Sequence, residues 1–179
     1  MTCCFGLAAA AAPTATWFGR SSAMVVAPPG AIRMDISWDG AVGAVSAAGT
    51  VTPRIGVAAS TSSAVPSYFE VKAVLVEDLV PFLFAATVGT EGVGVIATFF
   101  FGPVRIDAGR TWGRNASRWG TAQLSARPEL SMLFGADERA GRVEPFAGVR
   151  IFPGGHALWE IDLTIGRAGV RASISAVAW

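Results

Sequence analysis

The sequence predicts an all-β protein, a closed antiparallel up-and-down β-barrel of about ten strands, within a range of about eight to twelve. After residue 30, apolar and polar residues alternate with a period of two over most of the chain. This period is typical of strands, because successive side chains point to opposite faces. Short glycine-rich connections separate the alternating stretches, as antiparallel hairpins require.

The alternation is clearest in residues 143–178, where three successive strands are expected. Leu163 and Ile165 share one face of the middle strand, and Glu160 and Asp162 occupy the other. One face of this sheet is therefore almost purely apolar, while the other carries charges of both signs.

The same alternation predicts strands along the rest of the chain and separates all of the expected strands from loops. Strands are expected at residues 31–38, 51–57, 69–75, 104–108, 124–132, 143–151, 159–165 and 170–176. Residues 41–49 form either a long loop or a further weak strand. Loops are expected at residues 60–67, 112–120 and 135–142, which are polar, charged or glycine-rich.

The stretch from Val80 to Phe101 is apolar on both faces and allows two interpretations. It is long enough for a transmembrane helix, which needs about 20 apolar residues. It also fits a hairpin buried on both faces. Pro81, the glycine cluster, the central Glu91 and the β-branched and aromatic content favour the hairpin.

Residues 1–30 differ from the rest of the chain. The apolar run from Cys3 to Ala12 is too short to span a bilayer as a helix, and small residues follow it. This order is typical of a secretory signal peptide, although no Lys or Arg precedes the run. Residues 1–30 are interpreted as a signal-peptide remnant or a disordered tail, and residues 31–179 as one barrel domain.

Alternation alone does not say which face of the barrel points outward. The apolar face points inward in a soluble barrel and outward to lipid in a transmembrane barrel. The chain is 52% hydrophobic and only 15% charged, whereas soluble domains contain about 25% charged residues. The composition therefore favours the membrane.

The polar face carries nearly equal numbers of positive and negative side chains. Ionised groups removed from bulk water must pair, so we expect a structural network of ion pairs in the barrel lumen. Its predicted members are Arg33, Asp35, Arg54, Glu70, Lys72, Arg105, Asp107, Arg127, Glu129, Glu144, Arg150, Glu160, Asp162 and Arg171.

Aromatic residues gather near the ends of the expected strands, as in the aromatic girdles of membrane barrels. The set comprises Trp38, Tyr68, Phe69, Phe101, Trp112, Trp119, Phe134, Phe152 and Trp159.

With its strand pattern, its short turn at residues 166–169 and its terminal Trp179, the chain resembles the small outer-membrane β-barrels of bacteria, porin-like or OmpA-like, over residues 31–179. The resemblance implies location in the bacterial outer membrane, contact with its lipid, and recognition of the last strand, ending at Trp179, by the barrel-assembly machinery. Val177 and Trp179 lie on the phase opposite to the apolar face, so a bulge or register change is expected near the end.

Catalytic and cofactor chemistry is not indicated. His156 is the single histidine and lies in a turn without a nucleophile–base arrangement. Glu160 and Asp162 could form an acid–base pair, but arginines on neighbouring strands favour ion pairs. No metal spacing or phosphate loop is visible, so neither enzymatic activity nor a cofactor is predicted. A net charge of +1 gives no case for nucleic acid.

The sequence thus favours a structural or interaction protein of the outer membrane. Its lumen would be filled by side chains, as in barrels of about eight strands. Residues 39–50 and 135–142 are the candidate contact loops. Two alternatives stay open: a soluble secreted or periplasmic lipocalin-like barrel that binds an apolar ligand, and a narrow porin-type channel.

Overall fold

The computed structural model describes residues 32–38, 43–52, 54–63, 67–79, 82–90, 92–113, 116–139, 141–153, 159–166 and 169–178. The predictions for residues 1–30, for His156 and for Trp179 lie outside these ranges. In the part of the chain described, no helix is long and apolar enough to span a membrane.

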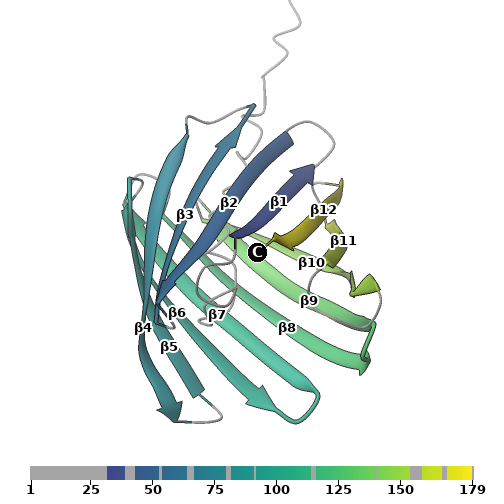
Figure 1. The fold of residues 1–179 in the computed structure, drawn as a ribbon. Helices are drawn as coiled ribbons and strands as arrows, with labels where there is room; N and C mark the ends of the chain where they lie inside the picture. Colours follow the sequence, from purple (N-terminus) through teal and green to yellow (C-terminus); the bar gives the residue numbers. More distant parts are fainter. Residues whose placement is uncertain are drawn as a thin grey trace, which may run out of the picture.

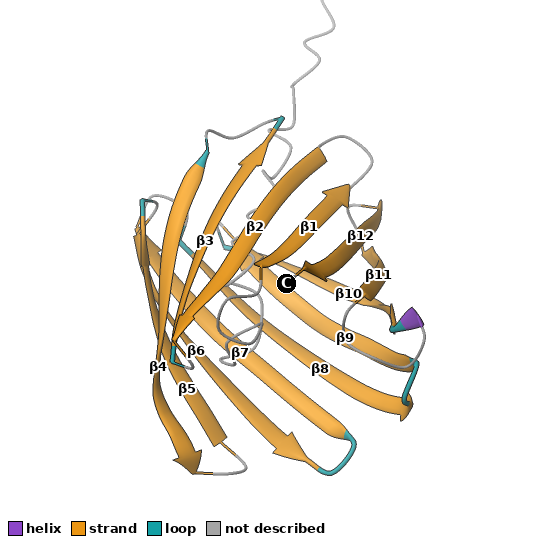
Figure 2. Ribbon diagram, in the orientation of Figure 1, coloured by secondary structure: helices purple, strands orange, loops and turns teal. Residues whose placement is uncertain are grey.

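Twelve strands form one closed barrel (Figure 1). Each strand pairs antiparallel with its neighbours in the chain, and the last strand pairs with the first. The strands are β1 (Ile32–Trp38), β2 (Gly43–Thr52), β3 (Ile55–Ser62), β4 (Tyr68–Leu79), β5 (Phe82–Gly89), β6 (Gly92–Phe101), β7 (Val104–Gly113), β8 (Ser117–Arg127), β9 (Leu130–Arg139), β10 (Arg142–Ile151), β11 (Trp159–Gly166) and β12 (Gly169–Ala178). Figure 2 shows that strands make up nearly the whole wall.

The predicted class, a closed up-and-down barrel, is confirmed, and the strand number lies at the top of the expected range. The stretch 124–132, expected as one strand, is divided between β8 and β9 by a turn at Pro128 and Glu129. Leu124 and Met132 pair across this turn, and paired residues share a face. The turn therefore does not interrupt the alternation of apolar and polar residues, and the alternation could not reveal it. The second additional strand is β2, which occupies most of the ambiguous stretch 41–49.

Three expected loops were wrong in extent. β3 continues to Ser62, β7 and β8 leave only residues 114–116 between them, and β9 and β10 leave only residues 140–141. The candidate contact segments 39–50 and 135–142 are therefore largely strand. Polar and glycine-rich composition was misleading here, because strand preference depends on the neighbouring strands more than on the residue itself.

The hairpin interpretation of residues 80–101 is confirmed, but the expected burial on both faces is wrong, because Val88 and Val93 on the outer face of the hairpin are 55% and 52% exposed. β5 and β6 pair in continuous register from Phe82 opposite Phe99 to Gly89 opposite Gly92. Gly92 has φ of +142°, a conformation that glycine adopts without strain.

The apolar faces point outward, as predicted for a membrane barrel. On β11 and β12, Leu163 is 42% and Ile174 is 50% exposed, whereas Glu160 is 9% and Ser175 is 2% exposed. In a wall one sheet thick, a buried side chain lies inside the barrel. The soluble alternative is therefore excluded for the described strands, because it requires the opposite orientation.

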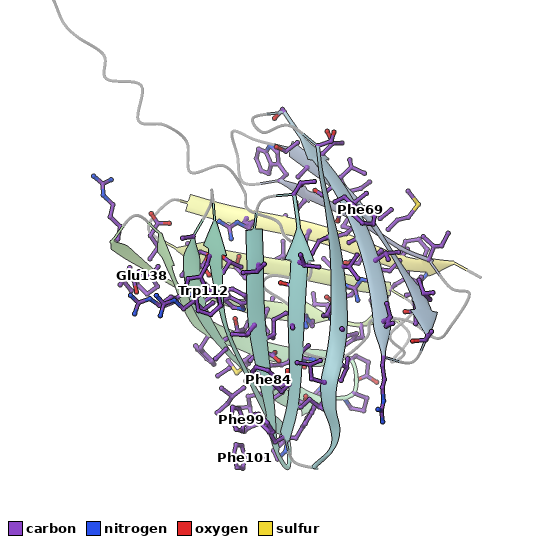
Figure 3. The ribbon with its side chains drawn as sticks, turned by 90° about the vertical axis from the view of Figure 1, so that its left-hand side faces the viewer. Phe69, Phe84, Phe99, Phe101, Trp112 and Glu138 are labelled. Atoms are coloured by element: carbon purple, nitrogen blue, oxygen red, sulfur yellow. The ribbon has the colours of Figure 1, made fainter. Side chains whose placement is uncertain are left out.

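Several outer aromatic residues lie toward the two rims of the barrel (Figure 3), but Phe134 of the predicted girdle is exposed in the middle of β9. We call the rim with the turn at residues 102–103 the Gly102 rim, and the opposite rim, where β7 ends, the Gly113 rim. Phe84, Phe99 and Phe101 lie toward the Gly102 rim, where the rings of Phe99 and Phe82 are 4.9 Å apart. Trp112 is the next-to-last residue of β7, at the Gly113 rim.

Trp119 corrects the predicted set, because it is buried inside the barrel. It packs in an apolar cluster with Val74, Ala85 and Ile96. Its ring lies directly over Gly109 on the neighbouring strand, where a Cβ atom would overlap it. A glycine is therefore needed at position 109 to seat the ring.

The Gly109→Ala substitution is expected to lower the free energy of unfolding by about 1–3 kcal/mol, the usual cost of overpacking. Gly120→Ala is the matched control, because a Cβ atom there would meet only the carbonyl oxygen of Asp107 at 4.0 Å. Urea unfolding in lipid vesicles measures both. Equal stability of the two variants would contradict the described packing of Trp119.

The expected bulge near the C-terminus is absent from the described part of β12. Its register with β1 runs without a shift from Trp38 opposite Ala172 to Ile32 opposite Ala178. Val177 pairs with Arg33 on the lumen phase, so regular alternation simply places one apolar residue inside.

Candidate functional site: the ion-paired lumen

The lumen holds a cluster of ionised side chains centred on Arg150 of β10. Arg150 and Asp162 are direct partners across β10 and β11, which brings their side chains together on the inner face. Nε and Nη2 of Arg150 donate hydrogen bonds to the two carboxylate oxygens of Asp162 at 2.8 and 2.7 Å. This two-pronged arrangement is the strongest geometry that an arginine and a carboxylate can form.

Glu160 joins Arg150 to the first strand. Its Oε1 lies 3.3 Å from Nε of Arg150 and 2.9 Å from Nη2 of Arg33. Arg33 and Glu160 are 127 residues apart in sequence and approach each other because β12 pairs with both β1 and β11. Both side chains are about nine-tenths buried. Closure of the barrel creates this ion pair, because it places β1 beside β12.

Uncharged polar residues extend the cluster around the wall. Arg150 Nη1 donates a hydrogen bond to Gln123 Oε1 at 3.1 Å, and Gln123 Nε2 donates to Ser131 Oγ at 3.0 Å. On the other side of the cluster, Ser175 Oγ donates to Asp35 Oδ1 at 3.0 Å. We call the set Arg33, Arg150, Glu160 and Asp162 the lumen cluster.

A second charged group lies on β6 and β7. Asp107 accepts hydrogen bonds from Thr98 Oγ1 at 2.7 Å and from Arg105 Nε at 2.9 Å. On β4, the side chains of Lys72 and Glu70 are also buried. Lys72 is within electrostatic reach of both Glu70 and Asp107, so charge of both signs lines this side of the lumen as well.

The structure places most, but not all, of the predicted network inside. The inner face carries Arg33, Asp35, Glu70, Lys72, Arg105, Asp107, Arg150, Glu160, Asp162 and Arg171. Arg54, Arg127 and Glu129 are instead exposed in or beside turns of the Gly102 rim, whereas Glu144 lies on the inner phase with Arg150 and is partly exposed near the Gly113 rim. At a strand end the alternating phase no longer dictates a face, so the prediction was wrong for the three turn residues.

Sequence reasoning missed the uncharged members of the site. Thr98, Gln123 and Ser131 are buried and hydrogen-bonded inside the lumen. Their phase in the alternation is that of the neighbouring charged residues, and this signal could have identified them. Among the described residues no cluster of His, Cys, Asp and Glu could hold a metal ion.

A closed antiparallel barrel with an apolar outer face and an ionised interior is a transmembrane β-barrel. Barrels of this class are typical of bacterial outer membranes, and the chain has the fold of an outer-membrane β-barrel.

Solved structures with the same fold are outer-membrane proteins. KdgM porin is 11% identical, with a TM-score of 0.60 over 83% of this chain and 98% of that one. KdgM porin in complex with disordered oligogalacturonate is 10% identical, with a TM-score of 0.57 over the same shares. The outer membrane protein Omp33 of Acinetobacter baumannii is 10% identical, with a TM-score of 0.50 over 82% of this chain and 94% of that one. No family model and no curated protein matches the sequence.

Proposed function

We propose that this protein is a narrow porin-type channel that passes small hydrophilic solutes across the bacterial outer membrane. The observation that carries the proposal is the set of ionised side chains inside a twelve-stranded barrel. In this proposal the lumen cluster forms the constriction, and solutes pass beside its paired side chains.

Strand number supports a passage rather than a completely filled lumen. A barrel of about eight strands has an interior that side chains just fill. Twelve strands spaced by about 4.8 Å and tilted by about 40° close at a backbone radius of about 12 Å. This lumen is wider than the one expected from sequence, which assumed fewer strands.

The composition of the lumen supports a channel without strong preference for ion sign. Arg33 and Arg150 are balanced by Glu160 and Asp162 in the lumen cluster. A small solute of either charge would find an opposite partner there. The complex of KdgM porin with an oligogalacturonate supports the idea that a barrel of this fold admits a polar solute.

The proposal makes the chain a passive conduit rather than an enzyme, in keeping with its fold similarity to a porin. Its other proposed partners are the lipid that surrounds the outer face and the barrel-assembly machinery. Contact with that machinery is proposed through the last strand, β12, and the terminal Trp179.

Planar-bilayer recording tests the proposed channel. The purified protein is expected to give stepwise conductance. In a salt gradient, Arg150→Gln should shift the reversal potential toward cation selectivity and Glu160→Gln toward anion selectivity, because each removes one fixed charge from the constriction. Arg127→Gln is the control, since Arg127 is exposed at the Gly102 rim. A flat trace from folded protein would favour a structural barrel with a closed lumen. Conductance with no shift in either variant would contradict the position of the constriction.

A further inference from the structure

Three charged residues form a row on the outer, lipid-facing surface of the barrel. Arg110 of β7 pairs directly with Arg118 of β8, and Arg118 pairs directly with Glu138 of β9. All three lie on the phase of exposed apolar residues such as Ile106 and Met132. Charged side chains on the outer face of a membrane barrel need an explanation, because most of that face contacts hydrocarbon.

The row is unbalanced in charge. Arg118 Nε lies 3.5 Å from Glu138 Oε2, while the guanidinium carbon of Arg110 lies 5.0 Å from the centre of the Trp112 ring. Two like charges directly opposite each other on neighbouring strands repel. The row thus holds two guanidinium groups and one carboxylate, which is paired with Arg118. The apolar residues Val95 on β6 and Val143 on β10 flank the row.

The row lies close to the Gly113 rim, at the depth where the headgroups of the surrounding lipid are expected. Arg118 is the second residue of β8, Glu138 is the next-to-last residue of β9, and Trp112 is next to the end of β7. Figure 3 shows Trp112 and Glu138 above Phe99 and Phe101, toward the opposite rim of the barrel. Tryptophan is enriched where a membrane meets water, and arginine on a barrel's outer face is tolerated there far better than at mid-membrane.

We propose that Arg110 and Arg118 bind the phosphate of a membrane-lipid headgroup at the Gly113 rim. A phosphate accepts paired hydrogen bonds from guanidinium groups and neutralises the repulsion between the two arginines. Stacking on Trp112 holds the Arg110 side chain against the outer face of the barrel, where a lipid headgroup can contact it. The proposal is independent of conduction through the lumen.

Lipid titration of the delipidated barrel in detergent, followed by native mass spectrometry, tests this site. The probe is phosphatidylglycerol, with diacylglycerol as the lipid lacking a phosphate. The double variant Arg110→Gln/Arg118→Gln is expected to bind phosphatidylglycerol about tenfold or more weakly, because it loses charged hydrogen bonds. Arg127→Gln should bind like the unmodified protein, since Arg127 is exposed at the opposite rim of the same strand.

Glu138→Gln gives the sharper test, because the proposal predicts a change of opposite sign. Removal of the competing carboxylate should strengthen phosphatidylglycerol binding. Heat-modifiable migration on detergent gels verifies that every variant is folded. The proposal would be overturned by unchanged binding in the double variant, by weaker binding in Glu138→Gln, or by equal binding of diacylglycerol. A changed oligomeric state without a change in lipid affinity would likewise overturn it and assign the row to a protein interface.

Discussion

Ile174→Arg is expected to destabilise the folded barrel by about 2–4 kcal/mol, the cost of an arginine at the lipid-facing midplane of a membrane barrel. Ile174 is half exposed on the outer face of β12. Its partners across the neighbouring strands are Ile36 and Ile161, so no carboxylate stands opposite the new charge. On a water-exposed surface the same substitution would have little effect.

Val170→Arg is the matched control, because Val170 lies on the same strand and the same outer face but at the Gly113 rim. Near an interface the cost falls to about 0–1 kcal/mol. Reversible urea unfolding in lipid vesicles, followed by migration without boiling, gives both values. Equal effects at the two positions would show that depth in a membrane does not determine the cost.

Arg150→Met is expected to lower the free energy of unfolding by about 3 kcal/mol, because it removes the arginine partner of the buried Asp162 carboxylate and one of the two arginine partners of Glu160. Arg150 contacts both Glu160 and Asp162, and its side chain is 18% exposed. The loss comes from the buried negative charges that are left with fewer partners, Asp162 above all, more than from the missing arginine itself.

A combined variant separates these two contributions. Adding Glu160→Gln and Asp162→Asn to Arg150→Met should restore most of the lost stability, although the ion pair between Arg33 and Glu160 is then lost as well. Arg127→Met, at the exposed end of β8, should change stability by less than about 0.5 kcal/mol. The same vesicle unfolding assay applies. Additive losses in the triple variant would mean that the lumen cluster is not energetically coupled.

Local alternation predicted the face of nearly every residue in the middle of a strand. Arg33, Glu160 and Asp162 were assigned to the interior in this way, and the structure places them there. The contact between Arg33 and Glu160 was not predictable, since it depends on how β1 meets β12 across the whole chain. Alternation is a property of neighbouring residues, whereas the closing register is a property of the barrel.

The failures have related causes. The turn at Pro128 and Glu129 kept the phase of the alternation and was therefore hidden. Trp119 was assigned to a girdle because it is aromatic and close to a strand end, but its phase is that of buried Gln123. Phase was thus a better guide than residue type, and applying it consistently would have placed Trp119 inside.

Labelling at two adjacent positions on β11 tests the orientation of the wall most directly. Leu163 is exposed on the outer face and Thr164 lies on the inner face. After Cys3 and Cys4 are replaced by serine, Leu163→Cys and Thr164→Cys are each spin-labelled in the folded barrel in vesicles. The label at position 163 should collide mainly with oxygen dissolved in lipid, and the label at 164 should not. The reverse pattern, with the label at 163 meeting only the water-soluble relaxant, would contradict an outer face in contact with lipid.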